Sequence, residues 1–553
     1  MKKTALGISI GHDRGAAVIQ NGTLIGAIAQ ERLDRIKHSS CSALPFESID
    51  RLLSYLSIGI DEIDCIGFSG AELENDLYMK FLLQTFYDYY QCSEKTSYMI
   101  SHHQSHAEAV FSASNFDEAL ILIADGGGDY TGNQAEAESL FIGKNSNVTL
   151  VNRRTQSPII RHMSDTCNYL YPCMPDFIRN RQLSLSRKYE QITYLLGFGW
   201  GQAGKTMGLA SYGKPLIQYN TPTNANFQYN IYSKDILEDL YSFELLSGKN
   251  HFEFIKENGP NIAQTIQTYT ENTIISLINS LVKHYHQHNI CLGGGLFLNC
   301  LLNHKILEKC SVDKLFVFPA CGDDGQAIGN AFAAYKKHFG TTKFSVPIPY
   351  LGISYSDQEI ESLLNGKNLS YTYHSDKELA CKMAELIAEN KIIGFHRGRT
   401  EIGPRALCHR SILANPANPQ MKDILNNRVK HREYFRPFAP VVVAERQYDI
   451  FNLKQESPYM LLAAPVHEQY RDKIPAVTHI DHTARVQSVS HEQEPFIHAF
   501  LIQLEEKIGV PVVLNTSFNV AGEPIVESPN DAIQTFLKTD IDVLVIGNYI
   551  VSK

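Results

Sequence analysis

The sequence predicts an α/β protein of two domains. In the N-terminal part, short apolar runs that end in polar glycine turns alternate with helical stretches. We expect a domain break at Gly340–Gly352, because Pro347 and Pro349 interrupt both the helix and the strand patterns there. The predicted domains are residues 1–345 and, with a different charge pattern, an α+β region over residues 346–553.

The composition is that of an ordinary globular protein, with 44% hydrophobic and 20% charged residues among 553. A net charge of −9 argues against broad nucleic-acid binding, which requires a basic surface. The 11 cysteines are scattered and form no Cys-x-x-Cys pair, so we expect a reduced, cytoplasmic protein. The apolar run Ala5–Ile10 is too short for a signal peptide, and no stretch approaches 18 uninterrupted apolar residues, so no membrane partner is expected.

The first 35 residues predict a strand and a hairpin. Leu6–Ile10 is a short apolar run that ends at the turn Gly11-His12-Asp13. Ala16–Gln20 and Thr23–Ala29 flank Asn21-Gly22, a pair typical of the type I′ hairpin turn. A helix is expected over residues 46–57.

A second apolar strand, Ala119–Ala124, also ends in a polar glycine turn, which begins at Asp125 about a hundred residues after the first turn. Residues 150–260 are the least readable part, and a polar stretch near residues 218–250 is typical of surface or an insertion. The further expected elements are a helix near 261–287, strands at 290–292 and 314–318, and a helix from Gln326 to about Tyr335.

Two histidines and two aspartates predict a metal site. His102 and His106 are four residues apart, so they share one face of the predicted helix. Asp125 and Asp323 each follow an apolar strand, where open α/β sheets bind ligands. Such a set suits iron, manganese or zinc. Solvated histidines and self-capping turn aspartates are the alternatives, and sequence logic does not separate Asp323 from Asp324.

Glycine turns predict a nucleotide cleft, because glycine lets backbone amides approach phosphate oxygens closely. Three such turns follow predicted strands, at Gly11, at residues 126–128 and at residues 293–295, and Gly204-Lys205-Thr206 lies among them. The turn at 293–295 is expected to open a helix, whose N-terminus favours anions. The candidate nucleotide ligands in these segments are Gly127, Gly128, Lys205, Gly294 and Gly295.

His12 lies in the first turn, beside Asp13. A neighbouring carboxylate can tune the pKa of a histidine, so His12 is a candidate general base. The alternative is a turn histidine that hydrogen-bonds the backbone.

The C-terminal part contains a basic segment. Residues 396–436 hold nine Lys and Arg but three Asp and Glu. Arginine forks match phosphate and carboxylate oxygens, and these arginines stand among Gly, Pro and Ala rather than in a helical surface pattern. We therefore expect a small anionic substrate such as an acyl phosphate. Downstream, Asn515, Ser517 and Asn519 follow a strand over Pro511–Leu514 and could bind a ligand or cap their own loop.

Several motifs together carry a family resemblance. They are Gly11-His12-Asp13, residues 102–107, the turn at 293–295 with Asn299, residues 398–407, residues 435–440 and residues 515–519. Over nearly the whole chain the sequence resembles the O-carbamoyltransferases of nodulation-factor and antibiotic biosynthesis, of the tobramycin and cephamycin type. The resemblance implies an N-terminal actin-like ATPase domain, similar to the tRNA threonylcarbamoyl transferase, and a C-terminal YrdC-like domain that forms acyl adenylates.

The resemblance also implies roles for single residues. Carbamoyl phosphate would become carbamoyl adenylate with Mg²⁺-ATP, and the carbamoyl group would pass to a hydroxyl of a small-molecule acceptor. The metal would be Fe²⁺, with Mn²⁺ or Zn²⁺ left open. The residues implied are His12 as catalytic base; His102, His106, Asp125 and Asp323 as metal ligands; Asn299 at the nucleotide; and Arg405, Lys430, Arg436, Arg485, Asn515, Ser517 and Asn519 at the adenylate-forming site.

Two other functions stay open at this point. One is a tRNA threonylcarbamoylation enzyme, which the acidic net charge disfavours. The other is a non-catalytic nucleotide-binding module of the actin-like type, which needs no pair of metal-binding histidines. The acceptor and the oligomeric state, with a homodimer among the options, are not determined by the sequence.

Overall fold

The computed structural model describes residues 2–41, 43–69, 76–132, 134–156, 183–219, 223–226, 236–347 and 349–553. The chain forms two compact units. Unit 1 comprises residues 1–68, 85–98 and 323–553, and unit 2 comprises residues 69–84 and 99–322. The fold is α/β, as predicted. The predicted boundary at 345/346 lies within unit 1, so a separate domain over residues 346–553 stays a prediction.

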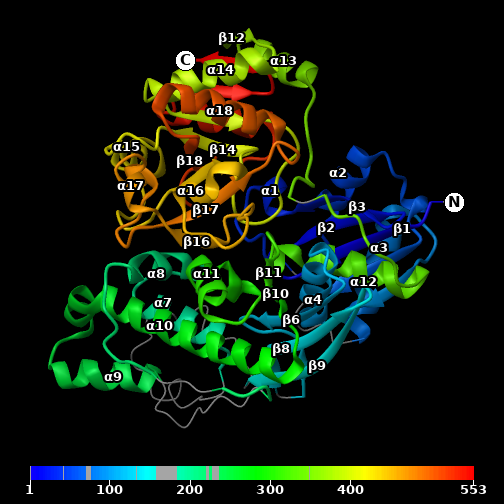
Figure 1. Ribbon diagram of the computed structural model, residues 1–553. Helices are drawn as coiled ribbons and strands as arrows, with labels where there is room; N and C mark the ends of the chain where they lie inside the picture. Colours follow the sequence, from blue (N-terminus) through cyan, green and yellow to red (C-terminus); the bar gives the residue numbers. More distant parts are fainter. Residues whose placement is uncertain are drawn as a thin grey trace. The chain divides into compact units, whose positions relative to one another are not determined.

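The N-terminal sheet of unit 1 has the strand order β3-β2-β1-β4-β5 (Figure 1). The first three strands form an antiparallel meander. Asn21 and Gly22 both have positive φ angles, 51° and 78°, which confirms the predicted tight hairpin. The strands are β1 (Thr4–Ser9), β2 (Gly15–Gln20), β3 (Thr23–Ala29), β4 (Cys65–Ser69) and β5 (Thr96–Met99).

Helix α12 (Gln326–Phe339) packs directly on β1, and two glycines allow this approach. A Cβ atom on Gly7 would lie 2.0 Å from the carbonyl oxygen of Ala327, and one on Gly67 would lie 2.3 Å from that of Asn330. Helix α2 (Phe46–Leu56) packs on β2 and β3, as its predicted range of 46–57 allows. Backbone-to-backbone packing therefore fixes α12 against the end of β1.

Unit 2 contains a second sheet, of six strands. Its central strand β6 pairs with β8 on one side and, in parallel, with β10 and then β11 on the other, while β9 continues the meander from β8. When the two-residue strand β7 is left out, the order β9-β8-β6-β10-β11 repeats that of the N-terminal sheet, with the first strand between the second and the fourth. The strands are β6 (Glu118–Ala124), β7 (Tyr130–Thr131), β8 (Gln134–Lys144), β9 (Asn147–Gln156), β10 (Asn289–Gly293) and β11 (Lys314–Val317).

The helices of unit 2 depart from the predictions at two places. Helix α10 (His251–Tyr285) begins ten residues before the predicted 261, because Asn250 caps it and Pro260 is accommodated inside. The glycine turn at 293–295 was expected to open a helix, but Gly295–Leu298 is a 3₁₀ turn. Helix α11 (Cys300–Lys309) begins later, since the Asn299 side chain accepts the Leu302 N–H at 3.1 Å.

The other described helices of unit 2 are α4 (His102–Ala113), α7 (Leu185–Leu195), α8 (Ala203–Ala210) and α9 (Ile236–Ser247). Among the helices of the described part of the chain, none has the length and apolar character needed to cross a membrane.

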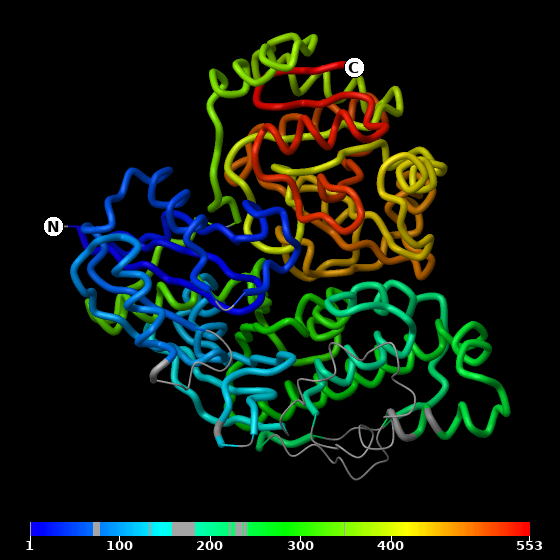
Figure 2. The backbone as a smooth tube through the Cα atoms, turned by 180° about the vertical axis from the view of Figure 1, so that it is seen from behind, coloured from blue at the N-terminus to red at the C-terminus, as the bar shows by residue number. Residues whose placement is uncertain are grey.

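A nine-stranded sheet forms the C-terminal part of unit 1, in the order β12-β20-β19-β13-β14-β18-β15-β17-β16. Most pairings are antiparallel, which agrees with the expected α+β character. Figure 2 shows the red final strand running beside the yellow-green segment of β12, its pairing partner. The strands are β12 (Ser370–Tyr373), β13 (Ile393–His396), β14 (Arg410–Ala414), β15 (Ala439–Val443), β16 (Leu462–Pro465), β17 (Thr483–Val489), β18 (Val512–Ser517), β19 (Val543–Ile546) and β20 (Tyr549–Ser552).

Helices α14 (Asp376–Ala388) and α18 (Pro495–Ile508) pack against each other and against this sheet (Figure 1). Their apolar faces bury Met383, Phe500 and Leu504 against Phe395 and Val441. Burial of this apolar surface is the main force that holds the C-terminal sheet and its helices together.

The Gly7 contact yields the first prediction. Gly7→Ala should lower the free energy of unfolding by about 3 kcal/mol, because the added methyl group overpacks the β1–α12 interface. Gly366→Ala is the matched control, since a Cβ there meets open space at the exposed end of α13 (Asp357–Gly366). Urea unfolding of both variants checks this, and equal midpoints would contradict the packing argument.

Candidate active site

The start of helix α4 is set by carboxylates. Oδ2 of Asp129 accepts the backbone N–H of His102 at 2.9 Å, and Oε2 of Glu136 accepts that of His103 at 3.4 Å. Negatively charged groups that accept hydrogen bonds are favoured at a helix N-terminus. The helix therefore begins at His102, and the four-residue spacing places His106 on the same face, as the sequence predicted.

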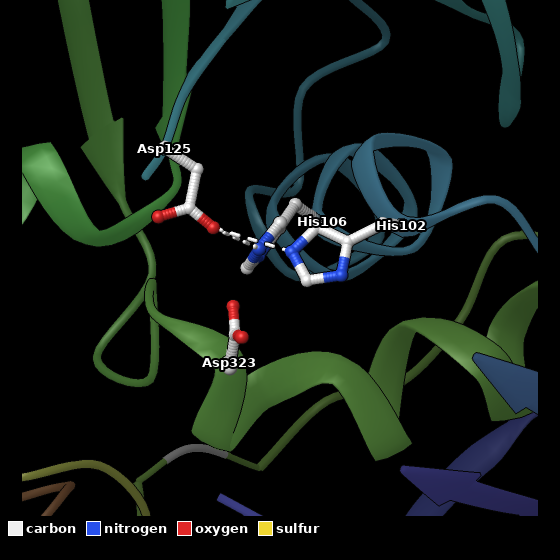
Figure 3. A group of neighbouring side chains, drawn as sticks. All are labelled: His102, His106, Asp125 and Asp323. Atoms are coloured by element: carbon white, nitrogen blue, oxygen red, sulfur yellow. Dashed lines mark hydrogen bonds and ion pairs between the residues drawn. The ribbon is translucent and has the colours of Figure 1, made fainter. Parts of the chain in front are cut away.

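Three predicted metal ligands converge within unit 2. Oδ2 of Asp125, at the end of β6, lies 3.2 Å from Nε2 of His102 and 3.3 Å from Nε2 of His106. Both imidazoles are buried. Figure 3 draws these three side chains together with Asp323, the residue that directly follows unit 2 in the chain. The three ligand atoms lie within 4.8 Å of one another, a spacing that a single ion can bridge.

Backbone amides orient the Asp125 carboxylate. Its Oδ1 accepts the N–H groups of Gly126 at 2.8 Å and Gly295 at 3.1 Å, so Oδ2 is left to face the histidines. Gly294, with φ of 93°, donates its N–H to the carbonyl of Cys321 at 2.7 Å, and a Cβ on it would lie 2.3 Å from the Ala124 carbonyl. The 293–295 turn thus holds both Asp125 and the chain that leads to Asp323.

Within unit 1, Asp323 lies beside the predicted base. Its Oδ2 is 3.0 Å from Nε2 of His12, whose Nδ1 lies 2.9 Å from Oδ2 of Asp13. Asp323 opens a 3₁₀ turn that precedes α12. Asp324, which the sequence could not separate from Asp323, instead lines a cavity of about 30 Å³ together with Arg32 and other residues of unit 1.

The charge state of His12 follows from these neighbours. Burial lowers its pKa, but the Asp323 and Asp13 carboxylates outweigh burial and raise the pKa to about 11. With both carboxylates charged, His12 is therefore an imidazolium at neutral pH. Neutralisation of Asp323 would bring the pKa back toward the range in which a histidine acts as a base.

The predicted nucleotide ligands lie in three separate segments of unit 2. Gly127 and Gly128 lie in the turn after β6, where a Cβ on Gly128 would come within 2.5 Å of Glu136. Asn299 uses its side chain to cap α11 and to donate to Gln267 at 2.9 Å. The ammonium of Lys205 lies 5.6 Å from the centre of the Phe198 ring. Nucleotide contacts of these residues stay predictions.

The predicted anion-binding residues come together in the C-terminal part of unit 1. Burial, and then the charges of Arg436 and Arg485, lower the pKa of Arg432; burial and the Arg405 charge lower that of Arg436, although Glu433 opposes the shift. Electrostatic effects of this kind act between charges in the same region of the fold. We call the following set the cationic cluster: Arg405, Lys430, Arg432, Arg436 and Arg485.

Arg432 is the member of this cluster to which the sequence assigned no role. Its guanidinium lies 4.1 Å from the centre of the Phe438 ring, and its Nε is buried without a hydrogen-bond partner in the described part of the chain. Its place in the basic segment was the one signal available in the sequence. That signal did not distinguish Arg432 from paired residues such as Arg428, which binds Asp542 at 2.9 Å.

Lys430 organises the loop that follows β18. Its buried ammonium donates to the carbonyls of Ser517 at 2.8 Å and Asn519 at 2.9 Å, and to Oδ1 of Asn519 at 2.8 Å. Burial and the charges of Arg432 and Arg436 lower its pKa. Asn515 donates to the carbonyl of Ala406 at 3.0 Å, next to Arg405. The predicted residues of this loop therefore lie beside the cationic cluster.

Comparisons with known proteins give the same family for both halves of the chain. Family models described as Carbamoyltransferase N-terminus and Carbamoyltransferase C-terminus match residues 69–332 and 384–553. Nodulation protein NolNO of Sinorhizobium fredii is 32% identical over 98% of this chain and 79% of its own length. An uncharacterised protein of Synechocystis sp. is 31% identical over 98% of this chain and 95% of its own.

Among solved structures, full-length HypF in its phosphate- and nucleotide-bound form aligns with a TM-score of 0.43 at 15% identity. The alignment covers 62% of this chain and 56% of HypF.

The converging ligands yield the second prediction. Asp125→Asn and His106→Ala should each weaken binding of a divalent metal by about 100-fold or more, because each removes a ligand that the fold holds in place. Metal content after dialysis, measured by mass spectrometry, checks this. His491→Ala, at an exposed histidine outside the site, is the control. A variant that retains the metal of the unmodified protein would exclude that residue as a ligand.

Proposed function

This chain belongs to the carbamoyltransferase family, and we propose that it carries the carbamoyl group of carbamoyl phosphate, through an ATP-derived adenylate, to a hydroxyl of a small molecule. The observation that carries the proposal is the cationic cluster. Four arginines and a lysine in partly or fully buried positions repel one another, and an anionic ligand would offset this repulsion.

The sheets of the structure support a reaction in two steps, each carried out by a different part of the chain. The two sheets, whose strand order is the same apart from the two-residue strand β7, fit the actin-like ATPase core that we propose for residues 1–345. The nine-stranded sheet that carries the cationic cluster fits a domain that forms the adenylate, and we propose that it is YrdC-like.

At the cationic cluster, the chemistry would begin with carbamoyl phosphate. Two-point contacts from guanidinium groups would hold its phosphate. Water would replace the phosphate to give carbamate, whose oxygen attacks the α-phosphorus of Mg²⁺-ATP. Carbamoyl adenylate forms and pyrophosphate leaves. The burial of Lys430 and the partial burial of Arg432 fit this step, because carbamate decomposes in bulk water.

We propose that Asp323 completes the metal site formed by His102, His106 and Asp125. The hydrogen bond between Gly294 and Cys321 holds the chain two residues before Asp323 next to the turn that contacts Asp125. Two imidazoles and two carboxylates fit iron, manganese or zinc, and a bound ion would polarise the carbamoyl carbonyl as a Lewis acid.

If Asp323 is a ligand, then His12, 3.0 Å from its Oδ2, stands beside the transferred group. Sharing the Asp323 charge with an ion would lower the pKa of His12, whose Nε2 could then take the proton of the acceptor hydroxyl. The acceptor oxygen would attack the carbamoyl carbon, and AMP would leave with the bonding electrons. Asp13 would hold the other ring nitrogen.

The third prediction tests the adenylation half-reaction without an acceptor. Purified protein with Mg²⁺-ATP should release pyrophosphate only when carbamoyl phosphate is present. Arg485→Gln should lower this rate at limiting carbamoyl phosphate by about 100-fold, because the phosphate loses a two-point contact worth about 3 kcal/mol. Arg428→Gln is the matched control from the same basic segment, since Arg428 pairs with Asp542 outside the cationic cluster.

The outcomes of this assay distinguish the proposed function from its alternatives. Release that depends on threonine and bicarbonate instead would support the tRNA-modifying alternative. Equal rates for the Arg485 and Arg428 variants would remove the assigned role of the cationic cluster.

The fourth prediction separates the two half-reactions. His12→Asn should leave pyrophosphate release within about twofold of the unmodified protein but lower carbamoyl transfer by at least about 100-fold. Asparagine retains a donor for Asp13 yet lacks the Nε2 atom that would accept the proton. Product analysis with a hydroxyl acceptor checks the second step. Equal loss of both half-reactions would contradict the role of His12 as the transfer base.

A further inference from the structure

A short segment of unit 1 joins the loop beside the cationic cluster to the candidate base, and no role has been given to it above. We propose that Arg35–His38, here called the strut, is a positioning element that holds Asp13 and, through Asp13, the imidazole of His12. The strut links this holding contact to the loop Ser517–Val526, here called the anion loop. The inference rests on the proposed function and deepens it.

One end of the strut is fixed to the anion loop. The guanidinium of Arg35 donates to the carbonyl of Ile525 at 2.6 Å and to that of Pro524 at 2.8 Å. These carbonyls belong to the loop that follows β18, nearly 500 residues away in sequence. A charged group that makes two bonds to adjacent carbonyls fixes direction as well as distance.

The other end of the strut is fixed to Asp13. Nδ1 of His38 lies 2.9 Å from Oδ1 of Asp13, and the Asp13 N–H donates to the His38 carbonyl at 2.9 Å. The second carboxylate oxygen of Asp13 lies 2.9 Å from Nδ1 of His12. Asp13 therefore sits between two imidazoles, and His38 determines how it meets His12.

The first residues of the anion loop are held by Lys430 of the cationic cluster. Lys430 donates to both the carbonyl and the side-chain oxygen of Asn519, and Nδ2 of Asn519 donates to the carbonyl of Glu523 at 2.6 Å. Arg35 binds the two residues that follow Glu523. An unbroken set of contacts within unit 1 thus runs from Lys430 through the anion loop and the strut to His12.

The backbone φ angles indicate that these contacts fix the conformation of the strut. Arg35, His38 and Asp13 have φ angles of 60°, 61° and 56°, in the left-handed region that non-glycine residues seldom adopt. Such conformations persist where the surroundings over-determine them. Removal of the Arg35 bonds should therefore let the strut relax toward ordinary backbone angles, which would shift Asp13 and His12.

A competing reading of this place is a second metal site, because Asp13, Glu31 and His38 bring ligand atoms within 4.8 Å of one another. The structure favours the strut. His38 already bonds Asp13, and Oε2 of Glu31 accepts the His38 N–H at 2.8 Å. The strut also accounts for the bonds of Arg35 to the anion loop, which a metal site at Asp13, Glu31 and His38 would not explain.

The test uses the His12 imidazole as its readout and needs no acceptor. In ¹H–¹⁵N spectra of the full chain, with His12 assigned through His12→Asn, the variants Arg35→Gln and His38→Ala should each shift the His12 resonances by more than the linewidth. His38→Asn, which keeps a donor for Asp13, should restore them. Pyrophosphate release with carbamoyl phosphate should stay within about twofold of the unmodified protein in His38→Ala, which leaves the bonds of Arg35 to the anion loop in place. With an acceptor, kcat should fall by about 100-fold at unchanged KM.

Arg446→Gln is the matched control, because Arg446 pairs with Asp449 and Glu505 outside this set of contacts. Unchanged His12 resonances in Arg35→Gln and His38→Ala, or an equal shift in Arg446→Gln, would overturn the proposal. If Arg35→Gln does not fold, the comparison of His38→Ala with His38→Asn decides alone. Failure of pyrophosphate release in the unmodified protein would reject the proposed function, while the His12 resonances would still report on the strut.

Discussion

The close contact of β1 with α12 is the constraint on which the candidate active site depends. Because Gly7 and Gly67 have no side chains, the first turns of α12 lie directly on the strands. His12 follows the end of β1, and Asp323 precedes the start of α12, so this one packing contact brings residues 311 positions apart to 3.0 Å. A bulkier strand would separate the His12 imidazole from the Asp323 carboxylate that raises its pKa.

The repeated sheet explains a regularity that the sequence showed without a reason. Two apolar strands about a hundred residues apart each end in a polar glycine turn, and the structure makes them the central strands β1 and β6 of two sheets whose order is the same apart from the short strand β7. Each central strand ends at a site residue, His12 after β1 and Asp125 after β6. Ligand sites at the carboxyl ends of such strands are a general feature of α/β sheets, so each sheet by itself presents a candidate site residue at the expected place.

The sequence predicted those features that local periodicity determines. The hairpin at Asn21-Gly22, helix α2 and the shared face of His102 and His106 all follow from spacing over a few residues, and the structure confirms them. The start of α10 was missed because Pro260 usually marks a helix boundary, yet here it lies inside the helix. The turn at Gly293 was assigned to a helix start because the capping role of Asn299 is not visible in the spacing of glycines.

The remaining site features could not be predicted, because they depend on contacts between distant segments. Arg432 and Arg428 look alike in the basic segment, and only the fold shows that Arg428 has an aspartate partner while Arg432 lies among other cations. Arg35 has no motif around it, and its carbonyl partners lie at residues 524 and 525.

The charges of the cationic cluster also bear on the order of substrate binding and carbamoyl transfer in the proposed reaction. A site of mutually repelling cations is most stable when an anion is bound, since burial removes the screening that water gives at a surface. Lys430 belongs to this cluster and holds the anion loop, so under the proposed function a phosphate that offsets its repulsion from Arg432 and Arg436 would stabilise the charged ammonium that donates to Ser517 and Asn519. Binding of the first substrate would thereby stabilise the loop against which Arg35 is anchored. Under the proposed function, a transfer base whose position depends on that loop would be best placed once an adenylate can form, and this order would limit loss of the labile carbamoyl group to water.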